Sequence, residues 1–150
     1  MLNASRQPFL LRLKDWFGFY NLTNFEVSIL KIAAITLSNI DNEILQKQLR
    51  QFNRVNRQID WNGNPAFKYG YTDFYIQRFG KPLRSDVLFQ KIERNEEFEI
   101  FRCVVCDEQE NRISVRLIAI HGQFFSIKFA SENRVWYPQG DYRFEDVASF

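Results

Sequence analysis

Residues 66–76 read AFKYGYTDFYI, and the period of two in this stretch predicts a β-strand. Residues 54–61, RVNRQIDW, alternate in a similar way, and the intervening NGNP at 62–65 is rich in turn-forming residues. We therefore expect 54–61 and 66–76 to pair as antiparallel strands. The second strand would carry Phe67, Tyr69, Tyr71, Asp73 and Tyr75 on one face, and Lys68, Gly70, Thr72 and Phe74 on the other.

This strand lies in the most aromatic part of the chain. Seven aromatic residues fall between positions 61 and 79, and 17% of the whole sequence is aromatic. Sixteen residues of the chain are Phe, which has no polar group, so most of them are expected in the core. The segment could form a sheet core, a ligand-binding face or a surface that stacks on nucleic-acid bases. Its aromatic residues are Trp61, Phe67, Tyr69, Tyr71, Phe74, Tyr75 and Phe79.

Helical patterns precede the strands. Residues 8–20 form an amphipathic pattern that predicts a helix packed on the sheet of the same domain. Thr23 and Glu26 have the spacing of a capping box, which predicts a helix over residues 24–37. Asp41 is an expected N-cap for a further helix. One face of that helix would carry Ile44, Leu45, Gln48, Leu49 and Phe52.

The rest of the chain favours a meander of short strands. Residues 98–107, 112–120, 123–130 and 134–137 are rich in β-branched and aromatic residues, and His121-Gly122 suits a two-residue hairpin turn. We predict a single α+β domain over residues 1–150, with helices at about 8–53 and strands at about 54–137. Its N-terminal helices would pack on a largely antiparallel β-sheet.

Composition favours a soluble cytoplasmic protein. The sequence is 45% hydrophobic and 25% charged, with two Cys and a net charge of +2. Residues 1–7 are polar, unlike a secretory leader. The longest apolar stretch, residues 25–37, is far shorter than the 20 or so apolar residues that cross a membrane. We therefore expect no association with a membrane.

No catalytic or metal-binding pattern is recognisable. His121 is the only histidine and suits a turn, and Cys103 and Cys106 lie in an expected strand, where they would point to opposite faces. The carboxylates Glu93, Glu96, Glu97 and Glu99 have the setting of a solvated connection. The sequence contains no glycine-rich phosphate motif. We assign no catalytic residue, metal or cofactor, and a non-enzymatic function is favoured over catalysis.

Asp73 interrupts the aromatic face and needs a partner. A salt bridge to Arg57 or Arg78 is the expected explanation. Whether this face is covered by the helices or open to a partner decides its role. The candidate binding residues are Trp61, Tyr69, Tyr71, Asp73, Tyr75, Arg57 and Arg78.

Two short patterns carry a resemblance. One is Gly70-Tyr71-Thr72-Asp73-Phe74, and the other is residues 122–129, GQFFSIKF, with Trp136-Tyr137-Pro138 shortly after. In these patterns the chain resembles small bacterial α+β proteins. The resemblance implies the fold and no particular function.

Three functions are open on this basis. The leading hypothesis is a non-enzymatic binding protein, of bacterial immunity or accessory type, that acts on another protein through the aromatic-rich sheet face. The second is nucleic-acid binding by the basic segment 47–84, and the third is a small-molecule-binding or hydrolytic domain with a Tyr- and Asp-lined pocket. The basic residues of that segment are Lys47, Arg50, Arg54, Arg57, Lys68, Arg78, Lys81 and Arg84.

Overall fold

The computed structural model describes residues 22–60, 68–78, 81–83, 92, 96–132 and 137–150. The helix expected over 8–20 and most of the strand expected over 134–137 lie outside the described residues. Two helices come first in the described chain, α2 (Asn24–Thr36) and α3 (Asn39–Gln51). The strands are β1 (Arg54–Asp60), β2 (Lys68–Arg78), β3 (Lys81–Leu83), β4 (Glu97–Asp107), β5 (Arg112–Ile120), β6 (Gln123–Ser131) and β7 (Tyr142–Ser149).

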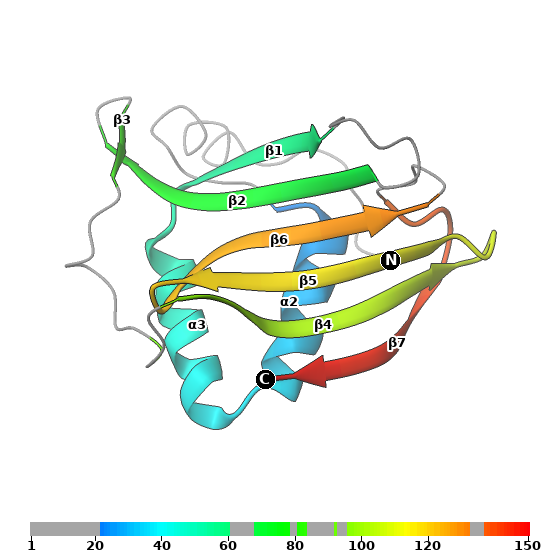
Figure 1. Ribbon diagram of the computed structural model, residues 1–150, viewed down its shortest axis with the longest axis horizontal. Coiled ribbons are helices and arrows are strands. Elements are labelled where there is room, and N and C mark those ends of the chain that lie inside the picture. Colours follow the sequence, from blue (N-terminus) through cyan, green and yellow to red (C-terminus); the bar gives the residue numbers. More distant parts are fainter. Residues whose placement is uncertain (1–21, 61–67, 79–80, 84–91, 93–95, 133–136) are drawn as a thin grey trace.

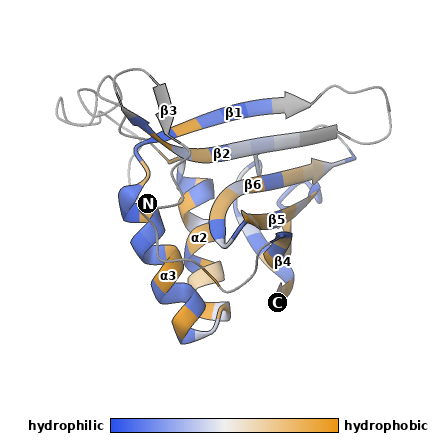
Figure 2. Ribbon diagram, turned by 60° about the vertical axis from the view of Figure 1, so that its left-hand side comes forward, coloured by the Kyte–Doolittle hydropathy of each residue, from blue (hydrophilic) through white to orange (hydrophobic). Residues whose placement is uncertain are grey.

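The strands form one antiparallel sheet, and both helices pack on the same side of it. The strand order is β1-β2-β6-β5-β4-β7, with β3 paired to β2 beside this path. Figure 1 looks onto the opposite side of the sheet, with α2 behind the strands, and Figure 2 shows the two layers from another angle. The predicted α+β class and the antiparallel pairing of 54–61 with 66–76 are confirmed.

The helices begin where side chains satisfy their first backbone amides. Thr23 Oγ1 accepts a hydrogen bond from the Glu26 amide at 3.1 Å, and Glu26 Oε2 accepts one from the Thr23 amide at 2.8 Å, which is the predicted capping box. The predicted N-cap Asp41 is wrong. Ser38 caps α3 instead, because its Oγ accepts from the Asp41 amide at 3.2 Å and places Asp41 in the first turn.

The core lies between the helices and the sheet face that they cover. Phe52, at the end of α3, packs with Phe74 of β2 and Phe124 of β6, and the rings of Phe74 and Phe124 are 4.8 Å apart. Gln48 of α3 is fully buried and holds the β5–β6 hairpin. Its Nε2 donates to the Gly122 carbonyl at 3.1 Å, and its Oε1 accepts from the Phe124 amide at 2.7 Å.

Two features of the C-terminal half bear on the predicted strands. The predicted His121-Gly122 turn is confirmed, with φ angles of 50° and 77°. β7 was not predicted, and strands therefore extend to Ser149 rather than ending near 137. Its sequence, YRFEDVAS, has three charged residues in eight and no clear alternation, which is typical of a half-exposed edge strand.

Candidate functional site

The two faces of β2 differ sharply in exposure. Thr72 and Phe74 are about 1% exposed and point toward the helices, whereas Tyr71, Asp73 and Tyr75 are only partly buried. This alternation is the one expected from the sequence. The Tyr71, Asp73 and Tyr75 face belongs to the side of the sheet that α2 and α3 do not cover, which we call the open face (Figure 1).

A cleft of about 280 Å³ lies in the open face. Its walls come from five strands, because residues facing one another in register on β1, β2, β6, β5 and β4 project on the same side. Asp73 is opposite Ser126, and Tyr71 is opposite Lys128. The lining residues are Gln58, Tyr71, Asp73, Glu97, Ile118, Ile120, Phe125, Ser126 and Lys128.

A bulge in β6 places Phe125 in the cleft. Ile118 pairs with Ser126 and the next residue, Ala119, pairs with Phe124, so Phe125 is an extra residue without a partner on β5. A β-bulge of this kind redirects a side chain and increases the local twist. The bulge therefore sets an aromatic ring beside Ser126 on the open face.

Asp73 is the most unusual polar residue of the cleft. Its Oδ1 accepts a hydrogen bond from Ser126 Oγ at 2.7 Å, and Ser126 is its only hydrogen-bond partner in the described part of the chain. Burial raises the pKa of Asp73, and the hydrogen bond from Ser126 only partly opposes this rise. A carboxyl with a raised pKa in a cleft is a recognised marker of a functional site.

The expected salt bridge between Asp73 and Arg57 is wrong. Arg57 pairs in register with Thr72 and reaches the covered side of the sheet, not the open face. There Arg57 binds Glu26, with Nε at 2.8 Å from Oε1 and Nη2 at 2.6 Å from Oε2. Arg57 is thus a structural residue that joins β1 to α2. The side chain of Arg78, the other expected partner, lies outside the described residues.

Glu26 is fully buried and holds several elements together. Its Oε1 also accepts from Thr72 Oγ1 at 2.7 Å, so one carboxylate contacts α2, β1 and β2. Burial on its own would raise the pKa of Glu26, but the hydrogen bonds from Arg57, Thr23 and Thr72 outweigh it and lower that pKa. The capping-box pattern pointed to the Thr23 contact alone, because the other contacts join distant parts of the chain.

The structure describes the remaining predicted residues only in part. Trp61 lies outside the described residues, and Tyr69 is in β2 with its side chain undescribed. Of the basic residues, Lys47 pairs with Glu43 on α3 at 2.9 Å, on the side of the sheet opposite to the open face. The basic segment is thus divided between the two sides, and nucleic-acid binding by it stays a prediction.

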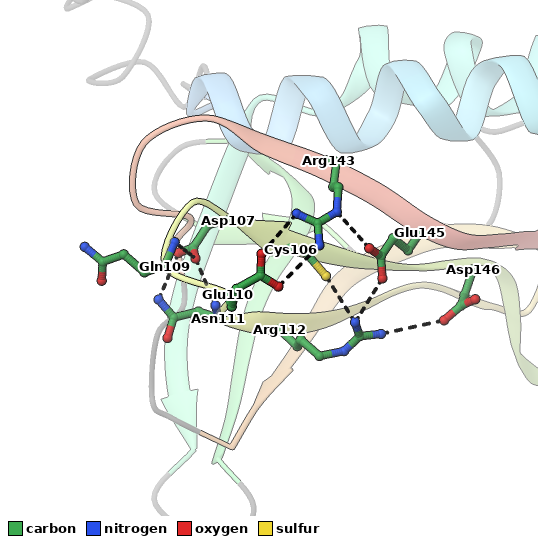
Figure 3. A network of polar contacts seen from close by, with 9 residues as sticks. All are labelled: Cys106, Asp107, Gln109, Glu110, Asn111, Arg112, Arg143, Glu145 and Asp146. Carbon is green, nitrogen blue, oxygen red and sulfur yellow. Dashed lines mark hydrogen bonds and ion pairs between the residues drawn. The ribbon is translucent and has the colours of Figure 1, made fainter.

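The two cysteines lie in β4, as predicted, and both are buried and free. Burial raises the pKa of Cys103 to about 12, which makes its thiol a poor nucleophile at neutral pH. The thiol of Cys106 accepts a hydrogen bond from Arg112 Nη1 at 3.3 Å, within a polar network that includes Glu145 and Arg143 (Figure 3). Burial is also the main cause of the raised pKa of Cys106.

Asp107 anchors the β4–β5 turn in the same view. Its buried carboxylate accepts from the amides of Gln109 and Asn111 at 2.9 Å each, and from Asn111 Nδ2 at 3.0 Å (Figure 3). It also accepts from the Gln139 amide at 2.9 Å. Burial alone would raise the pKa of Asp107, but these hydrogen bonds lower it. Every acceptor position is used within the protein, so this carboxylate is structural.

Seven cleft residues were absent from the predicted set: Gln58, Glu97, Ile118, Ile120, Phe125, Ser126 and Lys128. Glu97 was read as part of a solvated connection, and it is indeed exposed, but β4 brings it to the cleft. The alternation in residues 122–129 was a usable signal for Ser126 and Lys128, whereas Phe125 reaches the open face only because of the bulge. What the sequence lacks is the register that sets β6 beside β2.

Neither a search for metal sites and membrane spans nor comparison with known proteins assigns a function. In the described chain, no three His, Cys, Asp or Glu side chains are placed to hold a metal ion, and no helix has the length and apolarity needed to span a membrane. No protein-family model, curated protein or solved structure matches the chain. The geometry of the open face is therefore the basis for inferring a function.

We expect Asp73→Asn to stabilise the isolated protein at pH 7 by up to about 1 kcal/mol. Because the folded-state pKa of Asp73 is raised above its unfolded value near 3.8, ionisation opposes folding, and stability is lost as pH rises through the folded pKa. The gain should vanish near pH 2.5, which lies well below the unfolded-state pKa, so that the wild-type carboxyl is protonated in both states. Urea unfolding at the two pH values measures it, with exposed Asp141→Asn as the matched control. Equal stability of wild type and Asp73→Asn at both pH values would remove this account of Asp73.

Proposed function

We propose that this protein is a non-enzymatic binding protein whose open face engages a partner protein. One observation carries the proposal: the helices cover a single side of the sheet, and the other side presents Tyr75 together with a cleft lined by Tyr71 and Phe125. Tyr is among the residues enriched in protein interfaces, because it offers a large rigid surface with a polar end. A sheet backed by two helices also provides a surface that changes little on binding.

The cleft supports binding better than catalysis. Ser126 is only 3% exposed, which leaves its hydroxyl little access to a substrate. His121 lies at the hairpin turn and does not line the cleft. The raised thiol pKa values disfavour cysteine chemistry. A protein of immunity or accessory type, which works by covering a surface of its partner, fits this arrangement.

Affinity capture with paired variants tests the proposal. Tyr75→Glu places a charge on the open face, and Ile35→Glu places the same charge on α2, where Ile35 is 81% exposed on the helical side. We expect wild type and Ile35→Glu to retain the same proteins from the native cells, and Tyr75→Glu to lose them. Equal capture by all three proteins, or a loss confined to Ile35→Glu, would show that the open face is not the binding surface.

A further inference from the structure

We infer that the cleft receives a guanidinium group, that of an arginine, between Asp73 and the apolar wall formed by Ile118, Ile120 and Phe125. This inference rests on the proposed function and specifies the group that the open face recognises. The guanidinium could belong to a partner protein or to a free small molecule, and the experiment below separates these sources.

The charge of the cleft lining favours a cationic ligand. Two carboxylates, Asp73 and Glu97, face the cleft from β2 and β4. Within the described chain neither forms an ion pair, and the only hydrogen bond to either is the one from Ser126 to Asp73 Oδ1. Asp73 Oδ2 thus accepts no hydrogen bond from a described residue. A cation would supply what the protein itself does not provide.

Most arginines of the same face are already committed to other acids. Arg102 and Arg116 reach Glu99 at 3.9 and 3.7 Å. Arg112 and Arg143 both reach Glu145, at 2.9 and 2.8 Å (Figure 3). Among the described residues, Asp73 and Glu97 have no such basic partner.

Lys128 is the one cation in the lining, and its position is compatible with the inference. Its ammonium lies over the Tyr71 ring, 5.4 Å from the ring centre, where the negative face of the ring attracts it. The lining therefore holds two carboxylates against one ammonium. An anionic ligand would meet Asp73 and Glu97, whereas a guanidinium would balance them.

The size and walls of the cleft narrow the ligand further. A volume of about 280 Å³ is just below the roughly 300–1,000 Å³ of common small-molecule pockets, so it suits a side chain better than a nucleotide cofactor. Phe125 and Tyr71 offer aromatic surfaces on which a planar guanidinium stacks, and carboxylates bind guanidinium with two parallel hydrogen bonds. Ile118 and Ile120 suit the methylene stem.

Binding should depend on pH in a defined direction. Among the described residues, the charged or titratable groups on this face around Asp73 are Tyr71 and Tyr75 on β2, Arg54 on β1, Lys128 on β6, Arg116 on β5, and Glu97 and Glu99 on β4. Burial holds the pKa of Asp73 above its usual value. At a pH below that pKa the carboxyl is protonated, and it must lose its proton before it can pair with a bound cation. Affinity for arginine should accordingly strengthen as pH rises from about 4 to 7.

The test is titration of the full chain with N-acetyl-arginine amide, which mimics an arginine within a protein, and separately with free arginine. Amide chemical shifts in NMR report binding, and N-acetyl-citrulline amide is the neutral control of nearly the same shape. We expect N-acetyl-arginine amide to shift the signals of β2 and β6, and Asp73→Asn to weaken the binding at least about tenfold. The Asp141→Asn control should bind like wild type.

The outcomes separate the inference from the proposed function. Equal binding of the arginine and citrulline compounds, no binding of either, or full binding by Asp73→Asn would overturn the inference, even if capture of a partner still depended on Tyr75. Binding of the arginine compounds without any captured partner would support the inference and overturn the proposed function. Tighter binding of the blocked compound points to a protein side chain, and tighter binding of free arginine points to a small molecule.

Discussion

Glu26→Ala should lower the free energy of unfolding by about 3 kcal/mol, the effect expected when one member of a buried ion pair is removed. The substitution leaves the Arg57 guanidinium without its partner and deprives Thr72 Oγ1 and the Thr23 amide of their acceptor. The loss should fall at the lower end of the range for buried pairs, because 35% of the Arg57 side chain remains exposed to water. Urea unfolding at pH 7 measures it.

Two controls distinguish the ion pair from a general effect of losing a carboxylate. Glu43→Ala breaks the exposed pair with Lys47 on α3 and should leave stability almost unchanged. A Glu26→Leu and Arg57→Met double variant should recover part of the loss, because it leaves no buried charge unpaired. A loss in the double variant as large as that in Glu26→Ala would contradict the role given to the pair.

The same pair predicts sensitivity to acid. The folded-state pKa of Glu26 is lowered, so its contribution is present above the unfolded pKa near 4.5 and is lost as pH falls through the folded value. Glu26→Ala should therefore show a shallower loss of stability in acid than wild type.

Phe74→Ala should destabilise the protein by about 3–5 kcal/mol, whereas Tyr75→Ala should cost under about 1 kcal/mol. These neighbours in β2 point to opposite sides of the sheet. Phe74 is 1% exposed and packs against Phe52 and Phe124, so its removal leaves a cavity in the core. Tyr75 is partly exposed on the open face. Chemical unfolding of the two variants is the measurement.

This pair of variants also tests whether the open face is open in solution. A loss for Tyr75→Ala as large as that for Phe74→Ala would mean that another part of the chain covers Tyr75. That result would contradict the proposed function. A large loss of stability for Phe74→Ala but not for Tyr75→Ala agrees with a core that lies on only one side of the sheet.

The local patterns in the sequence predicted local structure well. The Thr23 and Glu26 spacing marks the start of α2, and the alternation in residues 66–76 separates the two faces of β2 correctly. These features depend on residues close together in the chain. The wrong N-cap prediction at Asp41 is also a local error of three residues. Ser38 and Asp41 both suit an N-cap, and only the path of the chain after Leu37 decides between them.

The candidate site could be predicted only in part, because it depends on contacts between distant residues. Tyr71 and Asp73 were recognised, but Lys128 and Ser126 come to face them through the register of β2 with β6. The actual partners of Arg57 and Asp73 could not be predicted from the sequence either. Arg57 binds Glu26, 31 residues away, and Asp73 binds Ser126, 53 residues away. Charge alone suggested pairing Asp73 with Arg57, and the strand pleat forbids it.

Asp73 gives the open face a measurable signature. A carboxyl that opposes folding when ionised, and that Asn could replace without strain, is expected where function and stability are in conflict. The predicted gain in stability of Asp73→Asn and its predicted loss of arginine binding should occur in the same protein. Their combination links the chemistry of the cleft to its position in the sheet.

Photocrosslinking from Tyr75 is the most direct test of the claim that the open face is the binding surface. A photoreactive phenylalanine analogue is placed at position 75, or at Ile35 on the exposed side of α2, and the protein is irradiated in its native cells. The account predicts a discrete crosslinked product from position 75, which excess wild type removes and excess Tyr75→Glu does not. A product from position 35 alone, or one from position 75 that both competitors remove equally, would contradict it.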